Sequence, residues 1–433
     1  MTMKTVAFAT LGCKVNQYDS DAMALLFERA GYRVVDFRER ADVYVVNTCT
    51  VTGTGDRKSR QMLGRAHRAN PEAVLVVAGC YAQQDPEAVL ALPGVKVALG
   101  TQRRGEVVSL CERAAATGQP INAVASLAGA RYEDLSAPRQ SGHTRAHVKI
   151  QEGCRQFCTY CVIPYARGPL RSRPLARVLQ EVEALCADGV REVVLTGIHL
   201  ASYGRDIGQP GALLTVLEAL EGVDGLERVR LGSLEPTLID EAFIAGIAPL
   251  TKLCPHFHLS LQSGCARTLE RMGRRYSPQQ YARAAALLRQ YDPLAALTTD
   301  VMVGFPGESE ADHADSLAFV ERMGFARIHV FAYSPRKGTP AAAYPDQVDP
   351  KIKEARTHEM GQLGDRLAVA YARGLVGRVE PVLLEQPHQG RMAGYTRYYV
   401  NTLTDAPAAR AGELVPCALV DADDQGNLIG RTV

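Results

Sequence analysis

The sequence predicts an α/β protein made of three parts, and two observations lead to this fold class. Short apolar runs alternate with helical patterns through most of the chain, which indicates parallel strands connected by helices. The last sixty residues change to short runs with glycine-rich turns, which are typical of a small β-barrel. We therefore predict a doubly wound parallel-sheet domain (1–115), a connector (116–144), a partial (β/α)6 barrel (145–372) and a small C-terminal β-barrel (373–433).

The composition is that of an ordinary globular enzyme: of 433 residues, 46% are hydrophobic and 22% are charged, with a net charge of +2. This balance neither indicates nor excludes a nucleic-acid partner, because local patches matter more than the total. We find no secretory segment and no run of about 18 apolar residues, so we expect a cytoplasmic protein without a membrane partner. Eleven cysteines in a reducing compartment are then expected to be ligands or buried thiols.

The N-terminal domain is predicted from strand-like runs and the helical patterns between them. The strands are expected at 5–11, 32–37, 42–48, 73–79 and 95–100. The helices are expected at about 19–30, 56–70, 86–92 and up to 115. In sheets of this kind, ligands bind beyond the carboxyl ends of the strands.

Three cysteines follow the ends of these strands: Cys13 the first, Cys49 the third and Cys80 the fourth. The predicted sheet brings them to one edge, although they are far apart in the sequence. Three converging thiolates suggest an iron–sulfur cluster with one iron left open. Buried inert thiols explain the spacing equally well, because cysteine is commonly buried.

The loop QEGCRQFCTYCVIPYARG (151–168) holds three more cysteines, Cys154, Cys158 and Cys161, within eight residues. Three thiolates on one loop can bind three irons of a cubane cluster and leave the fourth open to a small ligand. A structural zinc site and an electron-transfer cluster both need four ligands, although zinc or free thiols remain the alternative. The spacing resembles the signature of radical S-adenosylmethionine (SAM) enzymes, in which the open iron chelates the amino and carboxylate groups of SAM.

The central part is predicted from six strands alternating with helices. The strands are expected at 147–151, 192–198, 228–234, 256–262, 297–305 and 327–333. The helices are expected at 175–187, 213–221, 238–245, 278–290 and 310–322. Six such units fit the open (β/α)6 barrel of the radical SAM class, and barrel enzymes carry their chemistry at the carboxyl ends of the strands.

Polar residues gather at those predicted strand ends, and we interpret six residues as SAM contacts. Gly197 allows close backbone approach to a ligand, and the ring of Tyr160 is expected near the adenine. The other four supply donors and acceptors suited to the ribose and amino acid parts: Thr196, Ser233, Glu235 and Gln262. Each of these residues taken singly could instead belong to a turn or a helix cap.

Several motifs together resemble the methylthiotransferase family of radical SAM enzymes. They are the cysteine loop, LGCKVNQYDSD (11–21), NTCTVT (47–52) and AGCYAQ (78–83). Within that family, GCKVNQYDSD and QSGC (262–265) are most similar to the subfamily that modifies threonylcarbamoyladenosine in tRNA. The resemblance implies a second, auxiliary [4Fe–4S] cluster on Cys13, Cys49 and Cys80, which supplies or carries sulfur.

The resemblance further implies a reaction at C2 of N6-threonylcarbamoyladenosine beside the tRNA anticodon. Two clusters and two SAM molecules would take part, with all six cysteines acting in catalysis. The partners implied are the anticodon stem-loop of tRNA, an electron donor and a sulfur donor. The alternatives are methylthiolation of isopentenyladenosine in tRNA, methylthiolation of an aspartate in a small-subunit ribosomal protein, and a non-catalytic iron–sulfur RNA-binding protein.

The C-terminal segment GYTRYYVNT (394–402) resembles the TRAM RNA-binding domain that closes these enzymes. From residue 375 onward there are five Arg and no Lys against seven Asp and Glu, a net charge of −2. RNA binding here would therefore need a local patch that combines stacking rings with cations. The candidates are Arg391, Tyr395, Arg397, Tyr398 and Tyr399, and a purely structural barrel is the alternative.

Basic residues near the predicted site are candidates for phosphate contacts, with solvated helix faces as the alternative. One group follows the cysteine loop: Arg167, Arg171, Arg173 and Arg177. A second follows the QSGC motif: Arg267, Arg271, Arg274 and Arg275. A third lies on the helix after Cys49: Arg57, Lys58, Arg60, Arg65 and Arg68. The five cysteines without a role are expected to be packing residues: Cys111, Cys186, Cys254, Cys265 and Cys417.

Overall fold

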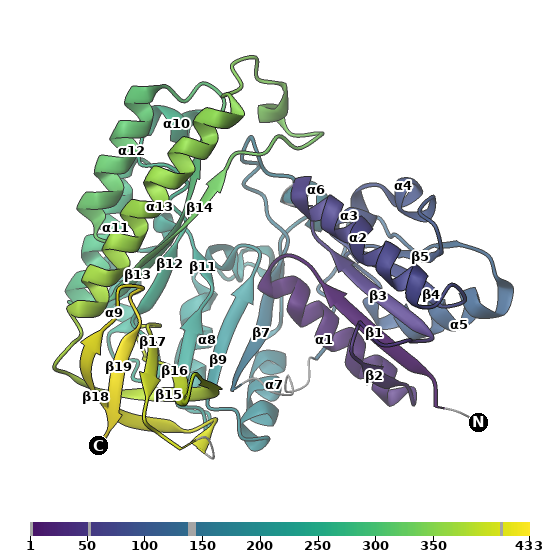
Figure 1. Cartoon of the computed structure of the whole chain (residues 1–433), viewed down its shortest axis with the longest axis horizontal. Helices are drawn as coiled ribbons and strands as arrows, with labels where there is room; N and C mark the ends of the chain where they lie inside the picture. The colour runs from purple at the N-terminus through teal and green to yellow at the C-terminus, as the bar shows by residue number, and fades with distance from the viewer. Residues whose placement is uncertain (1–2, 51–52, 137–143, 408–409) are drawn as a thin grey trace.

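The computed structural model describes residues 3–50, 53–136, 144–407 and 410–433. It shows three parts, with the N-terminal sheet beside a central array of strands and helices and a small barrel at one end of that array (Figure 1). No helix within these described ranges is long and apolar enough to cross a membrane.

The N-terminal part contains a six-stranded parallel sheet in the order β2-β1-β3-β4-β5-β6. Its strands are β1 (Thr5–Thr10), β2 (Arg33–Val35), β3 (Val43–Thr48), β4 (Val74–Gly79), β5 (Val95–Leu99) and β6 (Ile121–Asn122). Its helices are α1 (Lys14–Arg29), α2 (Gly53–Ala69), α3 (Cys80–Gln84), α4 (Pro86–Leu90) and α5 (Val107–Thr117).

The prediction of a doubly wound sheet is confirmed by two separate apolar layers on its faces. Val45 and Val76 pack in a cluster with residues of α1 and α5, whereas Val46 and Val77 pack with Leu63 of α2 and residues of α3 and α4. Successive residues of a strand point to opposite faces, so strands that are apolar throughout require helices on both sides.

Three details of this domain differ from the predictions. Helix α1 begins five residues earlier than expected, at Lys14, because Cys13 adopts the extended conformation of an N-cap. Helix α3, which starts at Cys80, was not predicted. The segment predicted as a connector adds β6 as a parallel edge strand of the sheet; its residues 137–143 lie outside the described ranges.

The central part is a partial barrel whose strands form two four-stranded sheets, β10-β9-β7-β8 and β11-β12-β13-β14. The first contains β7 (Arg145–Glu152), β8 (Arg171–Ser172), β9 (Glu192–Gly197) and β10 (Arg228–Leu231). The second contains β11 (Ser233–Leu234), β12 (His256–Leu259), β13 (Ala296–Val303) and β14 (Arg327–Ala332). The helices are α6 (Ile163–Arg167), α7 (Leu175–Ala187), α8 (Ala212–Glu221), α9 (Glu241–Ile247), α10 (Ala266–Arg271), α11 (Pro278–Tyr291), α12 (Glu310–Met323) and α13 (Pro350–Arg373).

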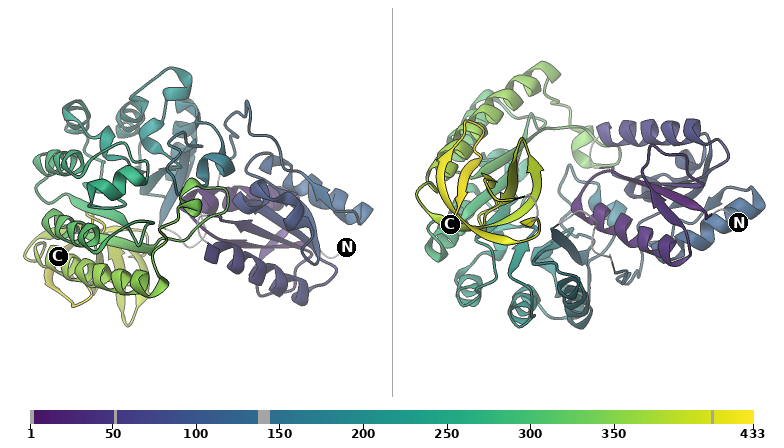
Figure 2. Two further views of the ribbon diagram at one scale, coloured as in Figure 1. Left: turned by 90° about the horizontal axis from the view of Figure 1, so that it is seen from above. Right: turned by 60° about the horizontal axis from the view of Figure 1, so that its bottom comes forward.

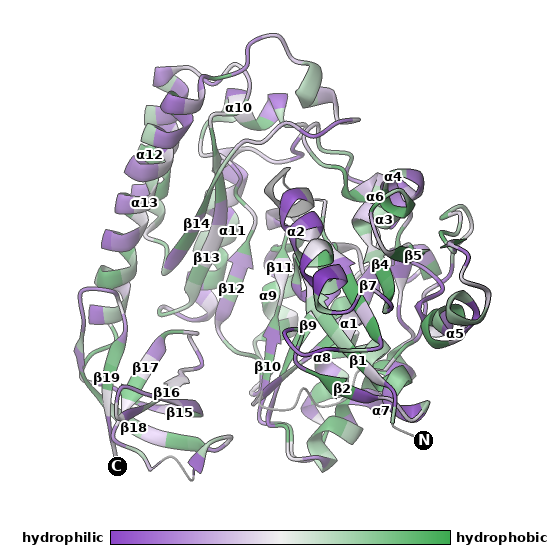
Figure 3. Cartoon of the chain, turned by 45° about the vertical axis from the view of Figure 1, so that its right-hand side comes forward, coloured by the Kyte–Doolittle hydropathy of each residue, from purple (hydrophilic) through white to green (hydrophobic). Residues whose placement is uncertain are grey.

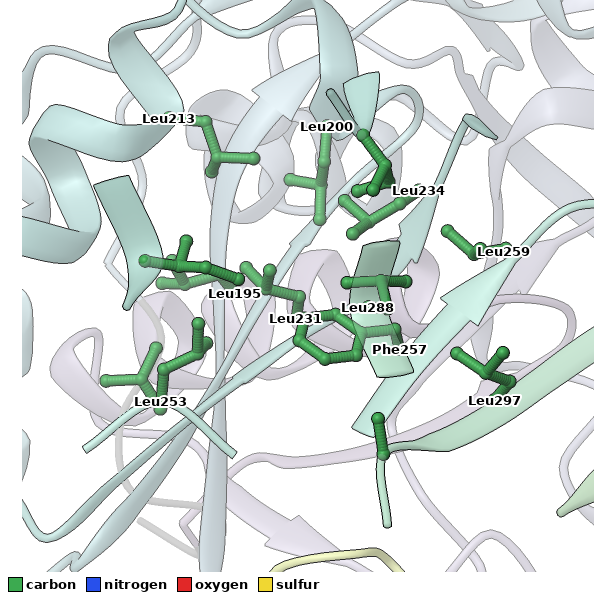
Figure 4. Close-up of a cluster of buried hydrophobic side chains, with 14 of the residues drawn as sticks. Leu195, Leu200, Leu213, Leu231, Leu234, Leu253, Phe257, Leu259, Leu288 and Leu297 are labelled. Carbon is green, nitrogen blue, oxygen red and sulfur yellow. The ribbon is translucent and has the colours of Figure 1, made fainter. Parts of the chain in front are cut away.

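The single strand predicted at 228–234 is broken at Gly232 into β10 and β11, which join different sheets. The backbone N–H of Gly232 donates to the carbonyl of Leu195, 2.8 Å away. The apolar core lies between the strands and their helices, where Leu195, Leu231 and Phe257 converge (Figure 4).

The C-terminal part is a closed five-stranded barrel in the order β15-β16-β17-β19-β18. Its strands are β15 (Val379–His388), β16 (Arg391–Tyr395), β17 (Asn401–Thr404), β18 (Leu414–Ala422) and β19 (Leu428–Thr432). The prediction of a small β-barrel is thus confirmed. It lies at the end of the central array where the central strands begin, as the right-hand view of Figure 2 shows.

The proposed RNA-binding patch of this barrel is largely occupied by packing against the central part. The ring of Tyr399 stacks on Tyr395 at 4.9 Å, and the guanidinium groups of Arg145 and Arg230 lie 4.9 and 4.6 Å from its centroid. Arg230 also donates to the carbonyl of Arg397 at 3.0 Å. Part of this patch is therefore used to hold the barrel in place, whereas Arg391 is exposed, and RNA binding by the patch stays a prediction.

A buried ion cluster joins the N-terminal and central parts. Asp19 of α1 contacts Arg104, Lys149 of β7 and Arg167 of α6, and Glu152 of β7 contacts the same three cations. Removing one partner from such a cluster leaves an uncompensated buried charge, which costs about 3–5 kcal/mol. The cluster therefore locks α1 and the loop after Cys13 against the start of the central barrel.

Candidate active site

The cysteine loop begins where β7 ends, at a glycine that no other residue can replace. Gly153 has φ +77°, and a Cβ placed on it would lie 1.8 Å from the carbonyl oxygen of Pro169. The next residue, Cys154, donates its N–H to the carbonyl of Gly168 at 3.1 Å. These contacts close the loop on itself, so that its three cysteines face one cavity.

The N-terminal cysteines lie together at the carboxyl edge of their sheet. Cys13 separates β1 from α1, and Cys80 is the first residue of α3. The side chain of Cys49 packs so closely on Gly12 that a Cβ there would lie 2.8 Å from its Sγ. The structure thus brings together three residues separated by up to 67 positions in the sequence.

A cavity of about 1030 Å³ lies where the three parts of the molecule meet. The cysteines in its lining are Cys13, Cys154, Cys158 and Cys161. Five of the six predicted SAM contacts also line it: Tyr160, Thr196, Gly197, Ser233 and Glu235. The sixth, Gln262, is not among the described residues that line the cavity. Its backbone N–H donates to the carbonyl of Asp300.

The thiols of both groups fit the ligand set of an iron–sulfur cluster. Burial raises the pKa of Cys80 and Cys154, and raises that of Cys161 to about 12, so metal loading must displace protons. Within the described part of the chain, no three His, Cys, Asp or Glu side chains surround a single metal position. A cubane cluster does not need such a position, because each thiolate binds a different iron.

Glu235 is held in a network that sequence reasoning did not detect. Its carboxylate accepts from Gln156 Nε2 at 2.8 Å, contacts His199 Nε2 at 2.8 Å, and pairs with Arg274 at 2.9 Å. Burial opposes its ionisation, but the hydrogen bond from His199 and the charge of Arg274 hold the pKa of Glu235 below its usual value. Arg274 also donates to the sulfur of Cys158 at 3.4 Å, so the network reaches the cysteine loop.

The role expected for Gly197 differs from what the structure shows. A Cβ at this position would lie 2.9 Å from the Cβ of Gln151 and 3.0 Å from a methyl group of Leu200. Glycine is therefore required here for packing of β9 against β7. Tyr160 presents a partly buried ring that contacts Phe305 edge-on at 6.3 Å and forms an apolar part of the cavity wall.

Most arginines proposed to contact phosphate are engaged within the protein. Arg167, Arg171 and Arg173 are buried, which contradicts that interpretation for them. Arg267 pairs with Asp312, Arg271 with Asp346, and Arg274 with Glu235. The third group differs, because all five of its side chains on α2 are exposed: Arg57, Lys58, Arg60, Arg65 and Arg68. None of those five has an ion-pair partner among the described residues.

Comparison with known proteins identifies the family. Residues 5–100 match Uncharacterized protein family UPF0004, and residues 148–320 match the Radical SAM superfamily. The chain is 41% identical over 426 residues to threonylcarbamoyladenosine tRNA methylthiotransferase MtaB of Bacillus subtilis (strain 168), covering 97% of this chain and 94% of that protein. The chain belongs to the radical SAM methylthiotransferase family. It is therefore an enzyme, and its family implies an iron–sulfur cluster and SAM.

The family contains relatives with a different named substrate. The tRNA-2-methylthio-N(6)-dimethylallyladenosine synthase of Moorella thermoacetica is 38% identical over 428 residues, covering 97% of this chain and 96% of that protein. Among solved structures, the radical SAM methyltransferase TsrM of Kitasatospora setae, with cobalamin and a [4Fe-4S] cluster bound, has a TM-score of 0.60 at 17% identity. That match covers 79% of this methylthiotransferase and 77% of TsrM, and it shows a shared fold.

Proposed function

We propose that the protein transfers a methylthio group to C2 of N6-threonylcarbamoyladenosine beside the anticodon of tRNA. The observation that carries this proposal is the shared cavity, which is lined both by Cys13 of the N-terminal part and by the cysteine loop of the central part. Two relatives named as threonylcarbamoyladenosine tRNA methylthiotransferases are 41% and 36% identical to this chain, and each alignment covers more than 90% of both proteins.

Each group of cysteines would hold one [4Fe–4S] cluster. Cys154, Cys158 and Cys161 would bind the cluster that chelates SAM, and Cys13, Cys49 and Cys80 would bind the auxiliary cluster. When bound, the clusters and two SAM molecules supply the radical that cleaves the C2–H bond, and the sulfur and methyl of the new group. Acid–base residues cannot supply this chemistry.

The chain's own residues would orient the reactants and exclude water. Arg274, fixed by Glu235, places a positive charge beside the sulfur of Cys158. The partly buried ring of Tyr160 keeps part of the cavity wall apolar. The hydroxyl groups of Thr196 and Ser233 line the same cavity and are available to polar atoms of SAM. At about 1030 Å³, the cavity has the size of a large small-molecule site.

The RNA would be held by the exposed face of α2. This helix follows the Cys49 strand and presents five cations, and Figure 3 shows strongly hydrophilic residues along it. Exposed Lys and Arg side chains without internal partners suit a phosphate backbone, since they release counterions on binding.

The deciding experiment is mass spectrometry of tRNA nucleosides from a strain lacking this gene, beside its parent. We expect loss of 2-methylthio-N6-threonylcarbamoyladenosine and accumulation of its precursor, restored by the wild-type gene. A Cys158→Ala gene should not restore it, whereas the matched control Cys186→Ala should.

Two other outcomes would contradict the proposal. Loss of the methylthio derivative of dimethylallyladenosine would assign the alternative tRNA substrate. An unchanged tRNA nucleoside profile would favour the alternative substrate, an aspartate of a small-subunit ribosomal protein.

A further inference from the structure

Three neighbouring strands turn a row of polar side chains into the cavity, away from the cysteine loop. In the parallel register, His258 of β12 lies beside Thr298 of β13, which lies beside Arg327 of β14. Two residues further along, Asp300 lies beside His329. All five line the cavity, whereas the alternate residues of β12 and β13 enter the apolar core. We call these five residues, with His256 at the start of β12, the polar wall.

Hydrogen bonding within the polar wall is incomplete. Thr298 Oγ1 lies 3.0 Å from His258 Nδ1 and 3.3 Å from His256 Nε2. His256 is only 5% exposed, yet its Nδ1 has no hydrogen-bond partner among the residues that the structure describes. Buried polar groups are nearly always paired in native proteins, so an unpaired one on a cavity wall indicates a missing polar ligand.

Two cations also face the cavity. Arg327 projects from β14, and Lys14 lies on the first turn of α1; both are exposed to the cavity. Neither has an ion-pair partner within the described ranges. The nearby Glu192 is already held by Arg230, Arg228 and Arg145.

One carboxylate belongs to the polar wall itself. Asp300 Oδ2 lies 3.3 Å from His258 Nε2. Burial lowers the pKa of His256 and His329, so both rings are neutral and act as hydrogen-bonding groups. The polar wall and Lys14 therefore combine two cations, neutral imidazoles and one acceptor carboxylate. This set matches a ligand that bears a carboxylate together with hydroxyl or N–H groups.

We propose that the polar wall binds the N6 substituent of the target adenosine through its carboxylate, with Arg327 and Lys14 as the cationic partners. His329 and Asp300 then face the hydroxyl and N–H groups of that substituent. This inference rests on the function proposed above and names the residues that select the substrate. A hydrocarbon substituent would leave the same groups unpaired, and sites built to hydrogen-bond a substrate discriminate strongly against analogues that cannot.

The test compares binding of two anticodon stem-loop RNAs to the holoenzyme, one carrying N6-threonylcarbamoyladenosine and one carrying unmodified adenosine at that position. Arg327→Gln should weaken binding of the modified RNA about tenfold or more, because a charged hydrogen bond is removed, and leave the unmodified RNA unchanged. Arg327→Lys, which keeps the charge, should retain most of the preference. The matched control is Arg322→Gln, on the outer helix α12.

The outcomes separate this inference from the proposed function. If the wild-type enzyme methylthiolates the modified RNA and Arg327→Gln keeps the full preference, the inference is wrong and the proposed function stands. If Arg327→Gln weakens both RNAs equally, Arg327 contacts RNA in general and the inference is also wrong. If the wild-type holoenzyme neither prefers nor methylthiolates the modified RNA, the proposed function fails.

Discussion

Arg167 shows how one buried side chain connects the two groups of cysteines. It lies on α6, six residues after Cys161, and its Nε donates to the sulfur of Cys80 at 3.3 Å. The same guanidinium contacts Asp19 and Glu152 at 3.1 and 2.9 Å. Burial opposes its charge, but these acceptors outweigh that effect and raise the pKa of Arg167 well above its usual value. Arg167 therefore ties the helix that follows the cysteine loop to the cysteine edge of the N-terminal sheet.

Gly153→Ala tests how strictly the backbone fixes the cysteine loop. The new methyl group would overlap the carbonyl of Pro169, so the loop must move, and we expect loss of most iron bound by Cys154, Cys158 and Cys161. Gly129→Ala is the control, because it has a similar φ of +68° but nothing within 4 Å. It should cost only about 1–2 kcal/mol of backbone strain and retain its iron. Iron content after anaerobic reconstitution is the measurement; equal iron in both variants would contradict the steric argument.

At the scale of elements, composition does not show which segment is open to RNA. The segment 394–402 is largely packed against the central part, whereas the cations of α2 are exposed. The aromatic and basic segment looks like an RNA-binding surface, yet Tyr398 is only 7% exposed and Tyr399 lies between two guanidinium groups. Helix α2 looks like an ordinary solvated face, yet five of its cations are exposed and have no ion-pair partner in the described part of the chain. Whether a basic or aromatic segment is available to RNA depends on what packs against it.

Reversing charge on α2 should weaken RNA binding. We expect the triple variant Arg60→Glu, Arg65→Glu and Arg68→Glu to lower affinity for tRNA about tenfold or more at low salt. The slope of log K against log salt should fall by about 0.7–0.9 for each phosphate that the helix no longer neutralises. Arg113→Glu on α5, which covers the opposite face of the same sheet, is the control. Unchanged affinity and slope in the triple variant would show that RNA binds elsewhere.

Tyr399→Ala should act on stability rather than on RNA binding. It removes a ring that packs on Tyr395, Arg145 and Arg230, and we expect the free energy of unfolding to fall by about 2–4 kcal/mol. Arg391→Ala, an exposed position on the same barrel, should change stability by less than about 0.5 kcal/mol. Urea unfolding midpoints give the comparison. A tenfold loss of tRNA affinity at unchanged stability would instead support the RNA-binding interpretation of this segment.

At the scale of the whole molecule, buried charges join the three parts. Asp19 and Glu152 lie between the N-terminal part and the barrel, and Glu192 lies where the C-terminal barrel docks. Burial by itself would raise the pKa of each carboxyl, but the neighbouring Arg and Lys charges outweigh it and lower the pKa. The relative placement of the parts, and hence the cavity between them, depends on these carboxylates being ionised.

Stability should therefore fall in acid. A carboxyl whose folded pKa is lowered contributes stability above its unfolded pKa of about 4, and that contribution disappears as the pH falls further. We expect the thermal midpoint to be nearly constant from pH 8 to about pH 5 and to drop steeply below about pH 4. Asp19→Asn should be less stable than the wild type at pH 7 but should be destabilised less by acidification. An equal acid dependence in both proteins would exclude Asp19 as a contributor.

Local patterns in the chain were enough to predict the order of the three parts, their fold classes and the cysteine loop, because periodicity and short ligand spacings are local properties. The grouping of Cys13, Cys49 and Cys80 needed the predicted sheet and the family resemblance as well. Such patterns failed at Gly232, where one apolar run serves two sheets. Which cations are free became visible only in the folded molecule. Arg167 and Arg327 are chemically identical, yet one is enclosed by carboxylates from distant segments and the other faces an open cavity. Burial and pairing depend on contacts between residues far apart in the chain, which no local pattern specifies.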